Sequence, residues 1–123
     1  MAITMNHLIV PATDRTTAAT FFADLLGLRV APQAGPFAPV RVNDDLTLDF
    51  DDRRDPQPGH YAFLVDDDTF DAVMERLQSG SADYGSGPMS GWDREINHLG
   101  GGRGVYVRDP NGHSYELFTA DPA

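Results

Sequence analysis

The sequence carries the same order of expected elements twice, and this repeat is the feature that most constrains the fold. Residues 5–10 form an apolar, strand-like run containing His7, followed by a helix-like segment and further short strands. After a charged, proline-rich stretch at residues 51–59, the order restarts with a strand-like run that opens on His60, 53 residues after His7. A chain of 123 residues with this pattern is expected to fold as one domain of two similar modules.

Each module is predicted to contain one amphipathic helix and several short strands. Phe22 and Leu26 in the first module, like Phe70 and Leu77 in the second, recur at helical spacing. The predicted helices are residues 16–26 and 69–78, and the predicted strands are residues 5–10, 28–31, 38–42, 46–50, 60–65, 82–84, 104–108 and 114–119. The pattern predicts an α+β fold for residues 1–123, with module one at about 1–52 and module two at about 58–121.

Composition narrows the classes of function. The chain has no cysteine, which removes disulfides, thiolate ligands and cysteine nucleophiles together. A net charge of −10 opposes binding to nucleic acid, because phosphates would be repelled, and its simplest role is solubility. No apolar run approaches the roughly 20 residues of a membrane span, and no signal peptide is apparent, so a cytoplasmic location is expected.

Two histidines and one glutamate form a candidate metal-ligand set. His7 and His60 lie at corresponding places in the two modules, and Glu116 lies in the last predicted strand. Two imidazoles and one carboxylate make a facial metal site with open coordination positions, provided that the three strands converge. A single strand histidine is more often a surface or core residue, and Glu116 could face solvent. The three residues together favour a divalent metal.

Three protein ligands are predicted in preference to four. Aligning Phe50 with Phe118 puts Leu48 in the place of Glu116. Side chains alternate along a strand, so Asp49 is expected to face away from the site unless a bulge shifts the register. Three ligands would leave positions for water, substrate and dioxygen. Fe(II) is the first choice, and Mn(II), Co(II) and Zn(II) suit the same ligands.

Several of these segments resemble a known family. Residues 6–10, 60–65 and 104–116 are similar to those of the vicinal oxygen chelate superfamily, which includes glyoxalase I, bleomycin-resistance proteins, fosfomycin-resistance enzymes and extradiol dioxygenases. Residues 35–50 and 95–104 resemble a ChaP-like subgroup within it. The resemblance covers nearly the whole chain. It implies two βαβββ modules whose curved mixed sheets enclose a metal site.

The resemblance also implies an activity and an assembly. The implied enzyme is a metal-dependent, dioxygenase-like oxidoreductase that cleaves or oxidatively rearranges an aromatic or quinonoid metabolite of the polyketide type, as in antibiotic biosynthesis. A homodimer with exchanged modules is expected, in which His7 of one chain meets His60 and Glu116 of the other. Such closed interfaces favour two-fold symmetry.

Other residues are candidates for catalysis or substrate binding. Tyr106, His98 and Arg103 are the catalytic candidates, through proton donation, general base action and binding of an anionic oxygen respectively. The substrate-binding candidates are Arg41, Phe37, Phe50, Trp92 and Asn97. Each of these residue types serves more often in packing or surface ion pairs. His113 is interpreted as a structural residue of the last hairpin, and the long glycine-rich segment at 80–102 as a functional loop.

Two alternative functions fit the same family. One is a drug-binding resistance protein that sequesters its ligand without chemistry. The other is a glyoxalase-like or thiol-transferase-like enzyme. The sequence shows no clear signature of a pocket for a thiol cosubstrate, and the potassium-loop residues expected of fosfomycin enzymes are not evident.

Overall fold

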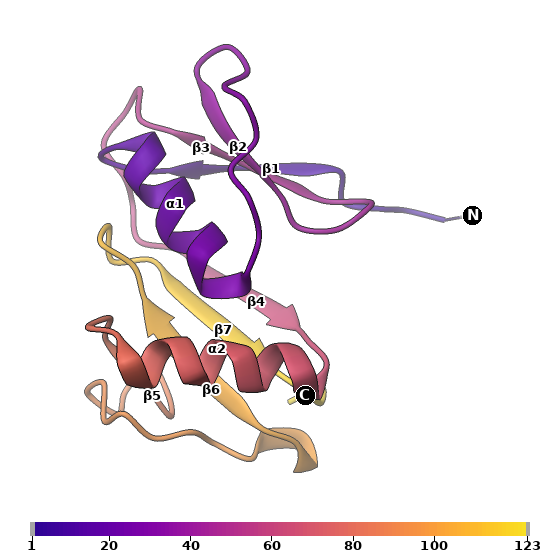
Figure 1. Cartoon of the computed structure of the whole chain (residues 1–123), viewed down its shortest axis with the longest axis vertical. Helices are drawn as coiled ribbons and strands as arrows, with labels where there is room; N and C mark the ends of the chain where they lie inside the picture. Colours follow the sequence, from indigo (N-terminus) through magenta and orange to yellow (C-terminus); the bar gives the residue numbers. More distant parts are fainter. Residues whose placement is uncertain (1, 123) are drawn as a thin grey trace. The chain divides into compact units, whose positions relative to one another are not determined.

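The computed structural model describes residues 2–122, which form two helices, seven strands and one short 3-10 helix. The chain divides into two compact units, Met1–Gln57 and Pro58–Ala123. Each unit combines one α-helix with one mixed sheet (Figure 1). The α+β class predicted from the sequence is confirmed.

Unit 1 contains one helix and a three-stranded sheet. Its elements are β1 (His7–Pro11), α1 (Arg15–Leu26), β2 (Phe37–Arg41) and β3 (Thr47–Asp51). The strand order is β1-β3-β2, with β1 parallel and β2 antiparallel to β3. The predicted strand at residues 28–31 is wrong, because this segment makes only an isolated bridge between Val30 and Val40. Pro32 follows it, and proline cannot donate to a strand ladder.

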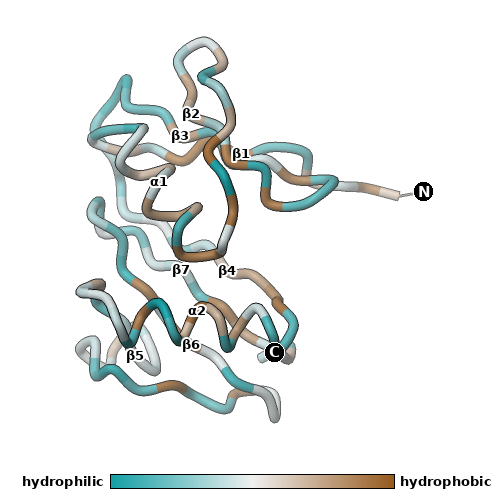
Figure 2. The backbone as a smooth tube through the Cα atoms, viewed as in Figure 1, coloured by the Kyte–Doolittle hydropathy of each residue, from teal (hydrophilic) through white to brown (hydrophobic). Residues whose placement is uncertain are grey.

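The ends of α1 follow from local chemistry. The Asp14 carboxylate accepts a hydrogen bond from the Thr17 amide at 2.9 Å, which satisfies a free donor of the first turn. Gly27 ends the helix with φ of 70°, a left-handed conformation that glycine adopts without a steric penalty. Figure 2 shows hydrophobic and hydrophilic positions alternating along both α-helices, as expected when one face of each is buried.

One side of the unit 1 sheet forms the core with α1. Val10, Leu48 and Phe50 are almost fully buried, and the Phe50 ring lies 5.9 Å from that of Phe22 on the helix. Because side chains alternate along a strand, His7 and Asp49 lie on the opposite side. We call this side, opposite α1, the open face of unit 1.

Unit 2 repeats the plan with a complete four-stranded sheet. Its elements are β4 (His60–Leu64), α2 (Asp67–Ser79), β5 (Tyr84–Gly85), η1 (Leu99–Gly101), β6 (Gly104–Arg108) and β7 (Ser114–Phe118). The strand order is β4-β7-β6-β5, and only the β4–β7 pair is parallel. The predicted weak strand at 82–84 appears as the two-residue β5.

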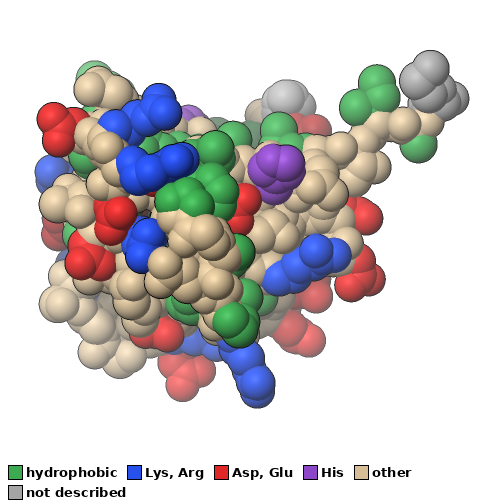
Figure 3. Space-filling view, turned by 90° about the horizontal axis from the view of Figure 1, so that it is seen from above, with side chains coloured by type: hydrophobic (Ala, Val, Ile, Leu, Met, Phe, Trp, Pro, Cys, Tyr) green, Lys and Arg blue, Asp and Glu red, His purple; other side chains and the backbone are tan. Residues whose placement is uncertain are grey.

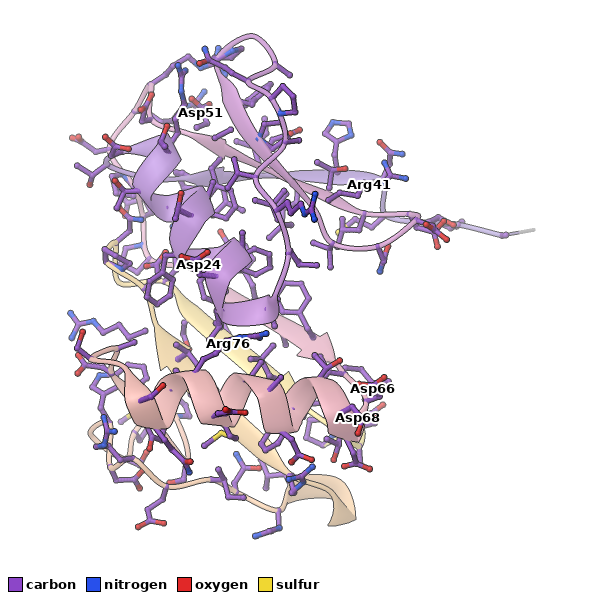
Figure 4. The ribbon with its side chains drawn as sticks, in the orientation of Figure 1. Asp24, Arg41, Asp51, Asp66, Asp68 and Arg76 are labelled. Carbon is purple, nitrogen blue, oxygen red and sulfur yellow. The ribbon has the colours of Figure 1, made fainter. Side chains whose placement is uncertain are left out.

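Helix α2 lies along one side of this sheet (Figure 1). Asp66 caps its first turn by accepting from the Thr69 amide at 2.8 Å. Figure 4 shows Asp66 and Asp68 at the start of the helix and Arg76 towards its end, an arrangement that complements the helix dipole. The centre of the core side of the sheet is fully buried, at Val105, Val107, Tyr115 and Leu117. The opposite side, which carries His60, Tyr106 and Glu116, is called the open face of unit 2.

The final hairpin is organised by Asp109. Its carboxylate accepts from the amides of Asn111 and His113 and from the Tyr115 hydroxyl. The His113 ring is fully buried, and its Nδ1 accepts from the Gly59 amide at 2.9 Å. These contacts agree with the structural role predicted for His113.

The segment between β5 and β6 folds back against the edge of the unit 2 open face. A Cβ atom on Gly85 would lie 3.0 Å from the Trp92 Cα, and one on Gly104 would lie 2.6 Å from the Asn97 Oδ1. Asp93 holds the turn by accepting from Ser86 N and Oγ at 2.9 and 2.7 Å. Trp92 has a φ of 56°, which costs energy in a residue other than glycine and is typical of functional segments.

Replacing Gly104 with alanine is expected to displace this segment. The new Cβ would meet the Asn97 side chain, which is fixed because it donates to the Ser86 carbonyl and accepts from the Leu99 amide. We expect Gly104→Ala to lower the free energy of unfolding by about 1–3 kcal/mol, as overpacking does in other proteins. Urea unfolding measures this change.

Gly87→Ala is the matched control, because its nearest neighbour, the Ser90 Oγ, lies 3.9 Å from the added Cβ. Fluorescence provides a second readout, since Trp92 is the only tryptophan of the chain and should change its emission in Gly104→Ala. Equal stability and unchanged emission in the two variants would show that the segment between β5 and β6 does not pack against Gly104.

Candidate metal centre

Three polar side chains converge on the open face of unit 2. Glu116 on β7 pairs with Ala62 of β4 on one side and with Tyr106 of β6 on the other. His60 lies two residues before Ala62 and therefore faces the same side of the sheet. Its Nε2 atom lies 2.9 Å from the Glu116 Oε1. Backbone pairing thus brings an imidazole, a carboxylate and a phenol together.

Burial makes this cluster electrostatically unusual. Glu116 is 6% exposed, and a buried carboxylate is costly unless it has partners. His60 and Tyr106 supply them. Burial raises the pKa of Tyr106 above its usual value, and the negative charge of Glu116 and a side-chain hydrogen bond with it add to the effect. The Tyr106 phenol is therefore protonated at neutral pH and available as a hydrogen-bond donor.

The spacing of the donor atoms suits a metal ion. Two ligand atoms that lie about 2.1 Å from one ion, at right angles, are about 3 Å apart. The His60 and Glu116 atoms are 2.9 Å apart. Imidazole nitrogen and carboxylate oxygen are also ligands that Fe(II), Mn(II) and Zn(II) accept. The pair therefore fits two adjacent positions of a divalent metal.

Ser114 adds a polar group that the sequence did not single out. It pairs with His60 across the β4–β7 ladder and lies on the same face as Glu116. Its hydroxyl is buried and has no hydrogen-bond partner among residues 2–122. A buried unsatisfied hydroxyl is costly, so this atom is suited to binding a ligand or water beside the pair.

In unit 1, His7 lies at the position equivalent to that of His60 in unit 2. His7 is the first residue of β1, as His60 is of β4, and each lies in a strand parallel to the last strand of its unit. The His7 side chain is exposed on the open face of unit 1, with its Nδ1 atom 2.9 Å from the Asn6 Oδ1. His7 therefore presents an imidazole on the open face of its own unit.

The register corrects the expectation that Leu48 replaces Glu116. Asp49 pairs with Ile9, two residues after His7, just as Glu116 pairs with Ala62, two residues after His60. Asp49 is thus the equivalent of Glu116, while Leu48 is 1% exposed in the core. The error came from aligning two phenylalanines that face opposite sides, because a slip of one residue reverses every face of a strand.

The candidate ligands come from both units, with His7 in unit 1 and His60 and Glu116 in unit 2. Across residues 2–122, no group of three or more histidine, aspartate or glutamate side chains is arranged to hold a metal ion.

Two of the predicted substrate-binding residues share the open face of unit 1. Phe37 pairs with Asp51 and Arg41 with Thr47, so they lie towards opposite ends of the sheet. Figure 4 shows Asp51 and Arg41 at these two ends. Phe50 does not share this face. It is fully buried against Phe22, which places it in the core and leaves no surface for a substrate.

Trp92 and Asn97 lie beside the open face of unit 2. Their segment rests on Gly85, which pairs with Tyr106, and on Gly104, two residues before Tyr106. His98, by contrast, is exposed, and its Nδ1 atom lies 3.1 Å from the Gly102 carbonyl oxygen.

Arg103 lies on the other side of the unit 2 sheet, next to α2. Its guanidinium contacts Asp71 at 2.7 Å and Asp67 at 3.0 Å and lies 4.6 Å from the centre of the Phe70 ring. It also lines a pocket of about 430 Å³ between α2 and residues 94–96. These contacts join the residue that precedes β6 to α2 and do not bring Arg103 to Glu116.

On the face drawn in Figure 3, acidic side chains are scattered around an area of hydrophobic ones. The role of the net charge of −10 in solubility stays a prediction. None of the helices in the described part of the chain has the length and apolar character needed to cross a membrane.

Several known proteins are similar to this chain over nearly its whole length. The chain is 45% identical to the oxidase ChaP-H2, covering 98% of this chain and 96% of that one with a TM-score of 0.90. It is 45% identical to the oxidase ChaP-H1, covering 98% of both chains with a TM-score of 0.87. Among curated proteins it is 28% identical to the glutathione transferase FosA of Serratia marcescens, over 100% of this chain and 85% of that protein. No family model matches the sequence.

A more distant structure shares only the fold. The fosfomycin resistance protein FosX from Listeria monocytogenes, in complex with Mn(II) and sulfate, is 16% identical with a TM-score of 0.71, covering 98% of this chain and 93% of that one. The level of identity to the two ChaP oxidases, over nearly the full length of all three chains, settles the family. The chain belongs to the vicinal oxygen chelate superfamily as a ChaP-like member and is an enzyme of that superfamily.

Proposed function

We propose that this protein is a metal-dependent oxygenase that acts on an aromatic or quinonoid metabolite of the polyketide type. The observation that carries the proposal is the contact between His60 and the buried Glu116, whose donor atoms are spaced for one metal ion. The 45% identity to two proteins named oxidases supports an oxidative reaction.

The proposed metal ligands are His7, His60 and Glu116. When bound, a redox-active ion such as Fe(II) would activate dioxygen and orient a substrate through its oxygen atoms, and Mn(II), Co(II) or Zn(II) suits the same donors. Asp49 shares the open face with His7 but is one methylene shorter than Glu116, which withdraws its carboxylate by about 1.5 Å towards its own strand. We assign Asp49 to binding a substrate hydroxyl rather than the metal.

The remaining open-face residues would bind and orient the substrate. Tyr106 stays protonated and can donate a hydrogen bond to a substrate oxygen beside Glu116. Trp92 and Asn97 border the same face and can provide an apolar wall and an amide contact. Phe37 and Arg41 on unit 1 can contact an aromatic ring and an anionic oxygen.

A second candidate function is thiol transfer, which the identity of 28% to a glutathione transferase favours. The two functions differ in what they consume and what they form. Consumption of dioxygen and formation of a glutathione adduct distinguish them.

Oxygen consumption tests the first proposal. We expect protein reconstituted anaerobically with Fe(II) to take up dioxygen with an ortho-hydroxylated polycyclic probe such as 1,2-dihydroxyanthraquinone. Glu116→Gln should lose the uptake and most of the bound iron, because a neutral amide is a poor ligand for a hard cation. Glu75→Gln, the same change on the exposed side of α2, should lose neither. An oxygen electrode and metal analysis give the two readouts.

The proposal would be wrong if fully metallated protein took up no dioxygen across a panel of polyphenols. Formation of a glutathione adduct under the same conditions would support the second function instead. Equal activity of Glu116→Gln and Glu75→Gln would remove Glu116 from the site.

We further propose that the metal centre is shared between the two chains of a homodimer. Each unit supplies only part of the ligand set, and each open face exposes apolar side chains. Ile9 is 48% exposed on unit 1, and Leu64 is 66% exposed on unit 2. Exposed apolar strand faces of this kind are suited to burial against another surface. A two-fold dimer would use each surface twice.

Mixing two inactive variants tests this arrangement. His7→Ala and Glu116→Ala chains should each bind little metal alone. If His7 and Glu116 at one site come from different chains, a mixed dimer contains one intact site and one doubly altered site. Random exchange should then restore roughly a quarter of the wild-type metal content and activity. No restoration in verified mixed dimers would place both ligands in the same chain.

A further inference from the structure

A second feature of the open face of unit 1 lies at the end of the sheet opposite His7. A pocket of about 280 Å³ is lined there by Ile9, Pro11, Asp51 and Arg54. Ile9, Pro11 and Asp51 belong to paired strands and share the face of His7, as alternation along β1 and β3 requires. Ligand pockets usually hold about 300–1,000 Å³, so this one is suited to part of a ligand, not a whole one.

Arg53 and Arg54 are neighbours in this region but differ in their interactions. Arg53 is committed to Asp51, with contacts from its Nε to Oδ1 at 2.9 Å and from its Nη2 to Oδ2 at 2.8 Å. These hydrogen bonds lower the pKa of Asp51 from 3.8 to about 2, so the carboxylate remains ionised and paired at neutral pH. The Arg53 guanidinium also lies 5.4 Å from the centre of the Phe37 ring.

Arg54 differs because its guanidinium forms no ion pair of this kind. Within the part of the chain that the structure describes, it makes no salt bridge and no hydrogen bond, although it is close enough to Asp51 to help lower that pKa. It is exposed and lines the pocket together with the apolar Ile9 and Pro11. A guanidinium with free donors, next to apolar side chains, is suited to a carboxylate or phenolate attached to a ring.

The distance along β1 relates this pocket to the proposed metal ligand. His7 and Pro11 are four residues apart on one strand, which corresponds to about 13 Å at 3.3 Å per residue. An elongated molecule of several fused rings can span such a distance along a strand. Phe37, which pairs with Asp51, lies at the same end of this face.

We propose that Arg54, Ile9 and Pro11 form a second subsite, which binds the anionic end of an elongated planar aromatic substrate whose reacting end lies at His7. This inference rests on the proposed function only for the statement that the substrate reacts at the His7 end. The subsite itself is tested by measuring binding. It selects ring systems that carry a carboxylate or an acidic phenol at one end over shorter or neutral ones. Arg53 fixes Asp51 and thereby leaves Arg54 available.

Binding of two matched probes tests the subsite. The probes are 9,10-anthraquinone-2-carboxylate and its neutral 2-carboxamide, titrated into the protein as purified and followed by calorimetry and by methyl NMR of Ile9. The wild type should prefer the carboxylate, and both probes should shift the Ile9 methyl signals. Arg54→Gln should weaken carboxylate binding about tenfold and carboxamide binding less than twofold. Arg29→Gln, another exposed arginine of unit 1 outside the pocket, should bind both probes as the wild type does.

Several outcomes would overturn the subsite. These are unchanged carboxylate affinity in Arg54→Gln, an equal loss for both probes, unshifted Ile9 signals, or no binding of either probe to the wild type. The outcome is separable from that of the oxygenase proposal, because no turnover is measured. Protein that consumes no dioxygen yet binds the carboxylate through Arg54 rejects the oxygenase and keeps the subsite. Active protein without an Arg54 effect rejects the subsite alone.

Discussion

The alternation of side chains along paired strands is the constraint on which the rest of this structure depends. In each unit, one set of alternate positions packs against a helix, and the other set is left on the open face. This single rule puts Leu48 in the core and Asp49 beside His7. It also brings Glu116 between His60 and Tyr106. The chemistry proposed for the protein is therefore a consequence of strand register and not of any local motif.

The strand register of unit 2 buries Glu116 and also supplies the side chains that surround it. A carboxylate that is 6% exposed needs partners, and the neighbouring strands provide an imidazole at 2.9 Å and a phenol whose pKa is raised. The same face holds the unsatisfied Ser114 hydroxyl. The open face of unit 1 has a pocket at the end of its sheet. There, the Arg53–Asp51 pair and the free Arg54 provide the charges. The two open faces thus have different proposed tasks, with the metal-binding Glu116 on unit 2 and an extended contact surface on unit 1.

Much of the fold could be predicted from the sequence, because helical spacing and strand runs are local signals. The helices and nearly all the strands were predicted, while residues 28–31 were not a strand because a proline follows them. The side of the sheet on which each strand residue lies was harder to predict. Phe50 and Phe118 look equivalent in sequence but lie on opposite sides of their sheets, which hid Asp49. Phe50 was predicted as a substrate contact because it is aromatic, and its full burial against Phe22 places it in the core. The partners of Arg103 were also hard to predict, since its ion pairs with α2 come from residues more than thirty positions away. Asp49 emerged only from the pairing of β1 with β3, and no local signal identified the partners of Arg103.

The central claim is that the two strand-opening histidines bind one metal ion together with Glu116. Pulsed electron paramagnetic resonance of the Mn(II)-loaded protein tests it most directly, because nitrogen couplings report each bound imidazole. The account predicts couplings from two imidazoles, of which one disappears in His7→Gln and the other in His60→Gln, while His98→Gln retains both. Couplings that are unchanged in His7→Gln would contradict it, because the ion would then be held by unit 2 alone.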